Sequence, residues 1–317
     1  MTEIKSSTIA GMSMKGGRND NFYFCLLQYF PDSKRWFLHS LLKVQDEKGL
    51  ESEEAIRSWI NRYKLKQLVV DFPLSKPACH DCLVDCPGDK ICVDHNVKEI
   101  RSKISKILID DKKIYSDSPK GYERNRNKDD EFDINKNLLD KNANDHLLSR
   151  SFKRKLKKGY LPYWNRPIDF WVWSQYHDQL LEFFNISYDS YGNTSLMIQS
   201  RFDYLKRHFP SDLELFEGNT SIALIELLKA NIISKRDLIN LKDFEVHAEA
   251  RLDIIKSIEK GLNIFVYDND LEILVKNPHA FDSFLLSVIG QNISTQENSN
   301  LPEWVNPDYC RFAAASF

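Results

Sequence analysis

The sequence predicts an α/β fold built on a mixed sheet whose first three strands are antiparallel. Three observations lead to this prediction. Residues 7–42 hold three short apolar runs separated by turn-forming residues. A segment with helical spacing of its apolar residues follows, and the next apolar run then ends at a proline. The order of three strands, a helix and a strand differs from the strict strand–helix alternation of a doubly wound fold.

Each early element has a local signal. Residues 7–13 form an apolar run that leads into a glycine-bearing turn, as expected of a buried strand. Residues 31–34 supply a hairpin turn between strands expected at 21–29 and 35–42. Ser52 can cap a helix over 52–63. Residues 68–73 are apolar throughout, which suits a central strand covered on both faces.

The later elements follow the same signals. A further strand is expected at 212–217, and residues 264–267 are either a short strand or a buried loop. Further helices are expected at 166–173, 197–209, 221–230, 235–241, 244–260 and 278–291. The α/β domain is therefore expected to comprise residues 1–75 and 160–292. Residues 293–317 form a tail without periodicity.

Residues 76–159 interrupt this pattern and are expected to be an insertion. The insertion begins with a group of cysteines, and a short helix is expected at 100–109. Residues 110–144 are rich in charged and amide side chains and poor in apolar ones, which predicts a partly mobile segment.

Composition limits the classes of partner. The 317 residues carry a formal net charge of -2, so no global attraction to nucleic acid or membrane is expected and any anion-binding surface must be local. The N-terminus lacks the basic start and following apolar run that mark a signal peptide. No stretch approaches the roughly 18 apolar residues that cross a bilayer. We therefore expect a cytoplasmic protein without a membrane partner.

Three acidic residues have apolar neighbours. Asp71 ends the strand at 68–73, Glu214 lies in the strand at 212–217, and Asp282 lies in the last helix. A carboxylate in such a place is costly to desolvate unless it is paired or binds a cation. If the three converge at one sheet edge, they suit Mg²⁺ or Mn²⁺, which could activate a water against a phosphodiester. Alternatively, Glu214 faces solvent and Asp71 caps a loop.

Four segments also resemble a known family, the predicted nucleases of the domain-of-unknown-function 429 group in the RNase H-like superfamily. These segments, which keep the family's order along the chain, are residues 9–17, 69–75, 213–216 and 279–286. The resemblance implies a five-stranded mixed sheet flanked by helices, with acidic metal ligands at Asp71, Glu214 and Asp282.

The chain departs from this family at the end of the first strand. The superfamily usually carries an aspartate there, and this sequence has Ser13. Asp20 or Glu217 could take over the missing charge. Otherwise the metal affinity is lower, or the protein has lost nuclease activity.

The cysteines of the insertion have a spacing typical of metal binding. Cys79, Cys82, Cys86 and Cys92 follow one another as Cys-x2-Cys-x3-Cys-x5-Cys. Four thiolates in one compact loop suit a structural Zn²⁺, and an iron–sulfur cluster is the second option. Two disulfides or four reduced thiols are the remaining readings, although disulfides are rare in a reducing compartment.

A basic run closes the insertion and could contact a phosphate backbone. Its cationic residues are Arg150, Lys153, Arg154, Lys155, Lys157 and Lys158. Aromatic residues nearby, Phe152, Tyr160, Tyr163 and Trp164, could stack on bases. Lys15, in the turn after the first strand, is a further candidate contact. Alternatively, the run is a solvated helix face that balances the acidic residues of 129–133.

Three functions are compatible with these features. The first is a metal-dependent nuclease, and the second is a nucleic-acid or protein-binding module that keeps the fold without its metal site. The third is hydrolysis of a small phosphate compound or nucleotide, for which the Gly16–Gly17 pair offers only a weak signal.

Overall fold

The computed structural model describes residues 7–14, 22–46, 49–50, 52–129, 134, 138, 147–188, 193–295, 301–305, 311–313 and 315–317. The chain divides into two compact units. Residues 1–74, 192–300 and 311–317 make the first unit, and residues 75–191 and 301–310 make the second. The second unit thus begins where the insertion was expected, and it extends past the expected end at residue 159.

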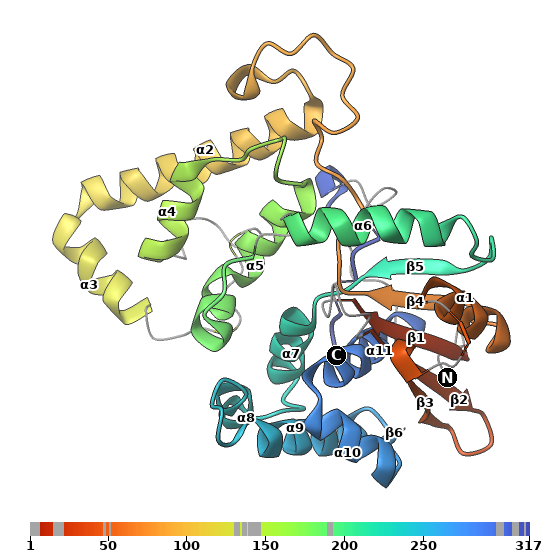
Figure 1. The fold of residues 1–317 in the computed structure, drawn as a ribbon. Helices are drawn as coiled ribbons and strands as arrows, with labels where there is room; N and C mark the ends of the chain where they lie inside the picture. The colour runs from red at the N-terminus through yellow and green to blue at the C-terminus, as the bar shows by residue number, and fades with distance from the viewer. Residues whose placement is uncertain are drawn as a thin grey trace. The chain divides into compact units, whose positions relative to one another are not determined.

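The first unit contains a mixed six-stranded sheet (Figure 1). Its strands lie in the order β5-β4-β1-β2-β3-β6. They are β1 (Thr8–Ser13), β2 (Tyr23–Phe30), β3 (Arg35–Lys43), β4 (Gln67–Val70), β5 (Glu214–Glu217) and β6 (Ile264–Phe265). The pairs β1–β2 and β2–β3 are antiparallel, whereas β4 is parallel to β1, β5 to β4 and β6 to β3.

The α/β class and the antiparallel start are confirmed, but the expected count of five strands was wrong. The sixth strand, β6, has two residues and pairs Ile264 with Trp36 and Phe265 with Phe37. So short a run carries no alternation signal, and its pairing with β3 depends on a tertiary contact that a local pattern does not contain.

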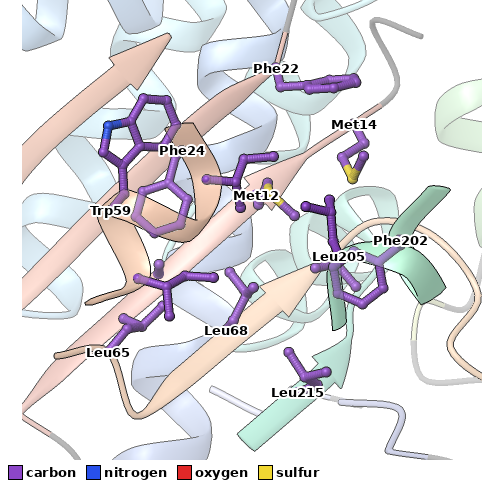
Figure 2. Close-up of a cluster of buried hydrophobic side chains, with 14 of the residues drawn as sticks. Met12, Met14, Phe22, Phe24, Trp59, Leu65, Leu68, Phe202, Leu205 and Leu215 are labelled. Carbon is purple, nitrogen blue, oxygen red and sulfur yellow. The ribbon is translucent and has the colours of Figure 1, made fainter. Parts of the chain in front are cut away.

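One face of the sheet packs against α1 (Ser52–Arg62) and α6 (Asn193–Lys206). Alternate residues of the strands point toward these helices, such as Met12 of β1 and Leu68 of β4. Figure 2 shows Trp59 of α1 and Phe202 of α6 among these strand side chains. This period-two pattern fixes which residues of β1 and β4 face the opposite side.

The opposite face packs against α7 (Thr220–Lys229) and α11 (Pro278–Thr295). Glycines let α11 approach the sheet closely. A Cβ atom added at Gly11 would lie 2.2 Å from the backbone oxygen of Ser283, and one at Gly290 would lie 2.3 Å from Ile9 Cγ2. These two contacts also show that α11 runs antiparallel to β1.

Three further helices complete the first unit: α8 (Lys235–Asn240), α9 (His247–Gly261) and α10 (Asp268–Lys276). No helix was expected where α10 lies. Leu274 is its only buried residue, and the helix has only nine residues, so its amphipathic signal is short.

Residues 311–313 pair with the edge of β5 that faces away from β4. Phe312 forms a parallel bridge with Glu217, whose backbone nitrogen donates to Arg311 O over 2.9 Å. The backbone nitrogen of Ala313 in turn donates to Glu217 O over 2.8 Å. Part of the tail expected to lack structure therefore pairs with the sheet.

The described part of the second unit is helical. It contains α2 (His95–Asp117), α3 (Pro119–Asp129), α4 (Arg150–Lys158) and α5 (Pro167–Phe184), with short 3₁₀ turns η3 (Asp89–Ile91) and η4 (Glu303–Val305). The short helix expected at 100–109 is thus 23 residues long. Asp94 caps it, accepting a hydrogen bond from Val97 N over 3.0 Å. Residues 110–129 are mostly helical, and most of 130–144 lies outside the described residues.

A buried ion pair anchors the start of α5. Arg166 and Asp169 have side chains that are 1% and 0% exposed, and they lie 3.2 Å apart. Arg166 Nη1 also donates to Ser75 Oγ over 3.0 Å, which ties α5 to the beginning of the second unit. None of the described helices is long and apolar enough to span a membrane.

Candidate functional site

The ends of β1 and β4 meet through Ser13 and Asp71. These are adjacent parallel strands, so their carboxyl ends lie at the same edge of the sheet. Ser13 is fully buried, and its Oγ donates to Asp71 Oδ2 over 2.6 Å. The other carboxylate oxygen, Oδ1, accepts from Met14 N over 3.1 Å. Ser13, at the end of the first strand, is therefore directly beside Asp71.

Glu217 lies at this same edge, one strand further on. It ends β5 and pairs with Val70, the residue before Asp71. Its side chain is only 4% exposed, and its Oε2 accepts from Leu74 N over 3.0 Å. The carboxylate thus holds the loop that follows Asp71.

Glu214 does not join this group, which corrects the expected trio of acidic residues. It is the first residue of β5, is exposed, and pairs with Gln67 at the beginning of β4. Glu217 is three positions further along the chain, which corresponds to about 10 Å along a strand. Glu214 does lie in a strand, as expected, but at the end away from Asp71. Asp71 directly follows β4 and Glu217 is the last residue of β5, so these two acidic residues share the same edge.

Asp282 lies at the end of α11 that approaches this edge. Leu286, one helical turn further on, packs with Val69 and would contact a Cβ added at Gly218. Residues four apart lie on the same side of a helix. α11 runs antiparallel to β1 and β4, so its earlier residues lie closer to the carboxyl ends of these strands. Asp282 is four residues before Leu286, and it therefore lies about 6 Å further along the helix axis, from the level of Val69 toward that of Asp71. Asp282 is half-buried.

Two basic side chains surround the start of α11. Burial lowers the pKa of Arg251, and the charge of Asp282 opposes that shift, so the two groups are within electrostatic range. Arg251 Nε donates to Val275 O over 2.7 Å. His279, in the first turn of α11, has a buried Nδ1 without a hydrogen-bond partner in the described structure. A single histidine gives no spacing signal, so the sequence did not single it out as a site residue.

The described acidic residues at this edge do not form a complete set of ligands for a divalent cation. Among the described residues, no three His, Cys, Asp or Glu side chains stand ready to hold a metal ion. Magnesium, however, often uses one or two carboxylates and takes its remaining ligands from water and substrate phosphates. Asp71 lies at this edge, and Asp282 lies at the end of α11 that approaches it. Lys15, Asp20 and the Gly16–Gly17 pair lie outside the described residues.

The four clustered cysteines have free thiols. Cys79 and Cys92 are half-buried, whereas Cys82 and Cys86 are exposed. Burial raises the pKa of Cys79, and negative charge on the other three thiols and on Asp94 raises it further. The four side chains are thus near enough to influence one another.

The basic run forms α4, and half of its cations have protein partners. Lys153 pairs with the buried carboxylate of Asp111, and Arg150 lies 3.4 Å from Glu123. Lys155 Nζ lies 4.3 Å from the ring centroid of Trp173. The remaining cations, Arg154, Lys157 and Lys158, are exposed.

Of the four aromatic residues near α4, two are buried and two are exposed. Phe152 and Tyr160 are buried in the second unit and cannot stack on a base. Tyr163 and Trp164 are exposed. Arg154, Lys157 and Lys158 together with the rings of Tyr163 and Trp164 are therefore exposed groups near this helix that nucleic acid could reach.

No family model, no curated protein and no solved structure matches the chain.

Proposed function

We propose that the protein is an RNase H-like hydrolase of phosphodiesters, with its site at the carboxyl edge of β1, β4 and β5. The observation that carries this proposal is the common position of Ser13, Asp71, Glu217 and Asp282 at that edge. Ligands of open α/β sheets generally bind beyond the carboxyl ends of parallel strands.

The sheet supports the RNase H-like part of the proposal. Five neighbouring strands, β3-β2-β1-β4-β5, agree with the mixed five-stranded sheet that the resemblance implied, and β6 adds to the outer edge of β3. Helices cover both faces of this sheet.

The residues have separate roles in the proposed reaction. Asp71 and Asp282 would hold Mg²⁺ or Mn²⁺, which when bound supplies an activated water and neutralises charge on the phosphate. Ser13 orients Asp71 through the hydrogen bond to Oδ2. Glu217 positions the loop after Asp71 by accepting from Leu74 N, and is a third acidic group at the edge.

A cleavage assay tests the proposal. Single-stranded, double-stranded and branched DNA and RNA are incubated with the protein and Mn²⁺ or Mg²⁺. We expect cleavage that falls at least about 100-fold in Asp71→Asn and Asp282→Asn, the range typical for loss of an essential group. Glu214→Gln is the matched control, because it removes a charge from the opposite end of β5. Cleavage unchanged by Asp71→Asn, or absent for every substrate, contradicts the proposal.

A second candidate, binding of nucleic acid without hydrolysis, is favoured by one observation. A serine hydroxyl occupies the place of the usual first aspartate, and Asp71 already accepts two hydrogen bonds from β1 and the residue after it. Millimolar Mn²⁺ separates the two candidates. An intact metal site raises the melting temperature, and Asp282→Asn abolishes the gain. Nucleic-acid binding without any such gain supports the second candidate.

The basic helix gives that second candidate its own test. Replacing Arg154, Lys157 and Lys158 by alanine removes three exposed cations of α4 and leaves Arg150, which lies near Glu123. If they contact phosphates, the affinity for nucleic acid falls and its dependence on salt becomes shallower. Lys153→Ala is unsuitable as a probe, because it also breaks the pair with Asp111.

A further inference from the structure

The segment from residue 76 to Asp94 has little to hold it in one conformation. Its regular structure is the single 3₁₀ turn η3. Four of its apolar side chains, Leu83, Val84, Ile91 and Val93, are exposed, and Leu83 is 99% exposed. Burial of apolar surface therefore does not offset the conformational entropy of ordering this segment.

Both ends of the segment are attached to well-defined structure. Cys79 N donates to Pro162 O over 3.1 Å, which ties the first cysteine to the stretch before α5. Cys92 lies two residues before Asp94, the cap of α2. Between them, Cys82 and Cys86 are exposed, and Gly88 adopts a φ of 109°, which an L side chain rarely adopts. The segment is therefore held near its two ends and exposed between them.

We propose that Cys79, Cys82, Cys86 and Cys92 together bind one structural Zn²⁺ ion in a tetrahedral site. Zinc with four thiolates at about 2.3 Å is a closed structural site that contributes directly to folding. The ion would join the segment before α5 to the start of α2, which replaces the apolar core that the segment lacks. Binding involves no redox step, because each thiol gives its proton to solvent as its sulfur becomes a ligand.

The arrangement of the cysteines fits this proposal. Their Cys-x2-Cys-x3-Cys-x5-Cys spacing places four thiols in one short segment. Among the described residues, no three His, Cys, Asp or Glu side chains stand in a ready metal geometry. Leu83 and Val84, between Cys82 and Cys86, are exposed, so apolar packing does not hold these two thiols in place.

Metal content and a cobalt spectrum test the site on the full chain. Protein prepared without chelator is expected to hold one zinc per chain, and Co²⁺ titrated into metal-free protein is expected to give the visible bands of tetrahedral cobalt thiolate. Cys82→Ser and Cys86→Ser are expected to lower zinc affinity at least about tenfold. Cys25→Ser is the matched control, because Cys25 is buried in the first unit.

The outcomes are distinct. Zinc bound at one equivalent, with the four thiols protected from a thiol reagent until a chelator is added, supports the site even if a variant fails to fold. Iron with a visible chromophore, disulfides found by mass spectrometry, or four thiols that react equally with and without zinc would each overturn it. The test is independent of any phosphodiester cleavage.

Discussion

Ser13 donates its hydroxyl hydrogen to Asp71 Oδ2 over 2.6 Å, so a side-chain contact joins two strand ends that are already neighbours in the sheet. The carboxylate therefore contributes to the fold as well as to the proposed site. Substitutions at Ser13 test these two contributions separately.

Ser13→Ala removes the donor and leaves Asp71 with the hydrogen bond from Met14 N. A hydrogen bond to a charged group contributes about 1.5–3 kcal/mol, so the free energy of unfolding should fall by that amount. Urea denaturation measures the change. Ser33→Ala is a control with an exposed hydroxyl that donates only to Phe30 O, and it should behave like wild type. Equal stability of both variants would show that the contact contributes nothing.

Ser13→Asp places a second carboxylate beside Asp71. Without metal, a buried carboxylate next to the half-buried Asp71 is repelled by it, so the melting temperature should fall. With Mn²⁺ the same pair should bind the cation more tightly than wild type does, and the variant should show the larger metal-dependent gain. Differential scanning fluorimetry with and without Mn²⁺ provides the comparison. The same gain in both proteins would argue against a cation at this edge.

Gly11→Ala tests the close contact between α11 and β1. The added Cβ would lie 2.2 Å from a backbone atom, so the helix or the strand must move. Overpacking of this kind costs about 1–3 kcal/mol or more. Gly121→Ala in α3 meets only the Ser118 side chain and should be neutral or slightly stabilising. Comparable stability of the two variants would contradict the observed spacing.

Asp169→Asn tests the buried ion pair of the second unit. It leaves the Arg166 guanidinium buried without its counter-charge, which typically costs about 3–5 kcal/mol. Calorimetry should show the loss in the transition of the second unit. Glu272→Gln breaks an exposed pair with Lys276 and should change little. A small effect of Asp169→Asn would mean that water reaches the pair.

Cys25 provides a prediction about pH. Burial raises its pKa to about 12, with Ser287 lowering it in part and Asp270 raising it. In the unfolded chain the thiol ionises near its usual value of 9.0. The group's contribution to stability is therefore complete below pH 9 and is lost as the pH rises toward 12. At pH 8 iodoacetamide should alkylate the exposed Cys82 in the native, chelator-treated protein and Cys25 only after unfolding. Rapid labelling of native Cys25 would contradict its burial.

The sequence predicted the elements whose signal is local. The strands that end at Ser13 and Val70 and the helix from Ser52 were found because their apolar residues recur at the strand or helix period. The apolar run at 264–267 indicated a short strand or a buried loop but not the strand that it pairs with, and α10 was not found. The two residues of β6 depend on pairing with β3, and α10 buries a single side chain.

The candidate site was partly predictable for the same reason. Asp71 stands out because it follows an apolar strand, and the end of a strand is where a parallel sheet binds ligands. The choice between Glu214 and Glu217 depends on register, which pairs Glu217 and not Glu214 with Val70. Register is a relation between distant segments, so a pattern within one strand cannot supply it. The burial of Phe152 and Tyr160 likewise depends on neighbours elsewhere in the chain.

The bridge between Phe312 and Glu217 has a consequence for how the protein is produced. Without residues 311–313, β5 would become an open strand at the border of the sheet, with its amide and carbonyl groups free to recruit another molecule. Shortened versions that stop before residue 311 should therefore self-associate. Affinity tags are better fused at the other terminus.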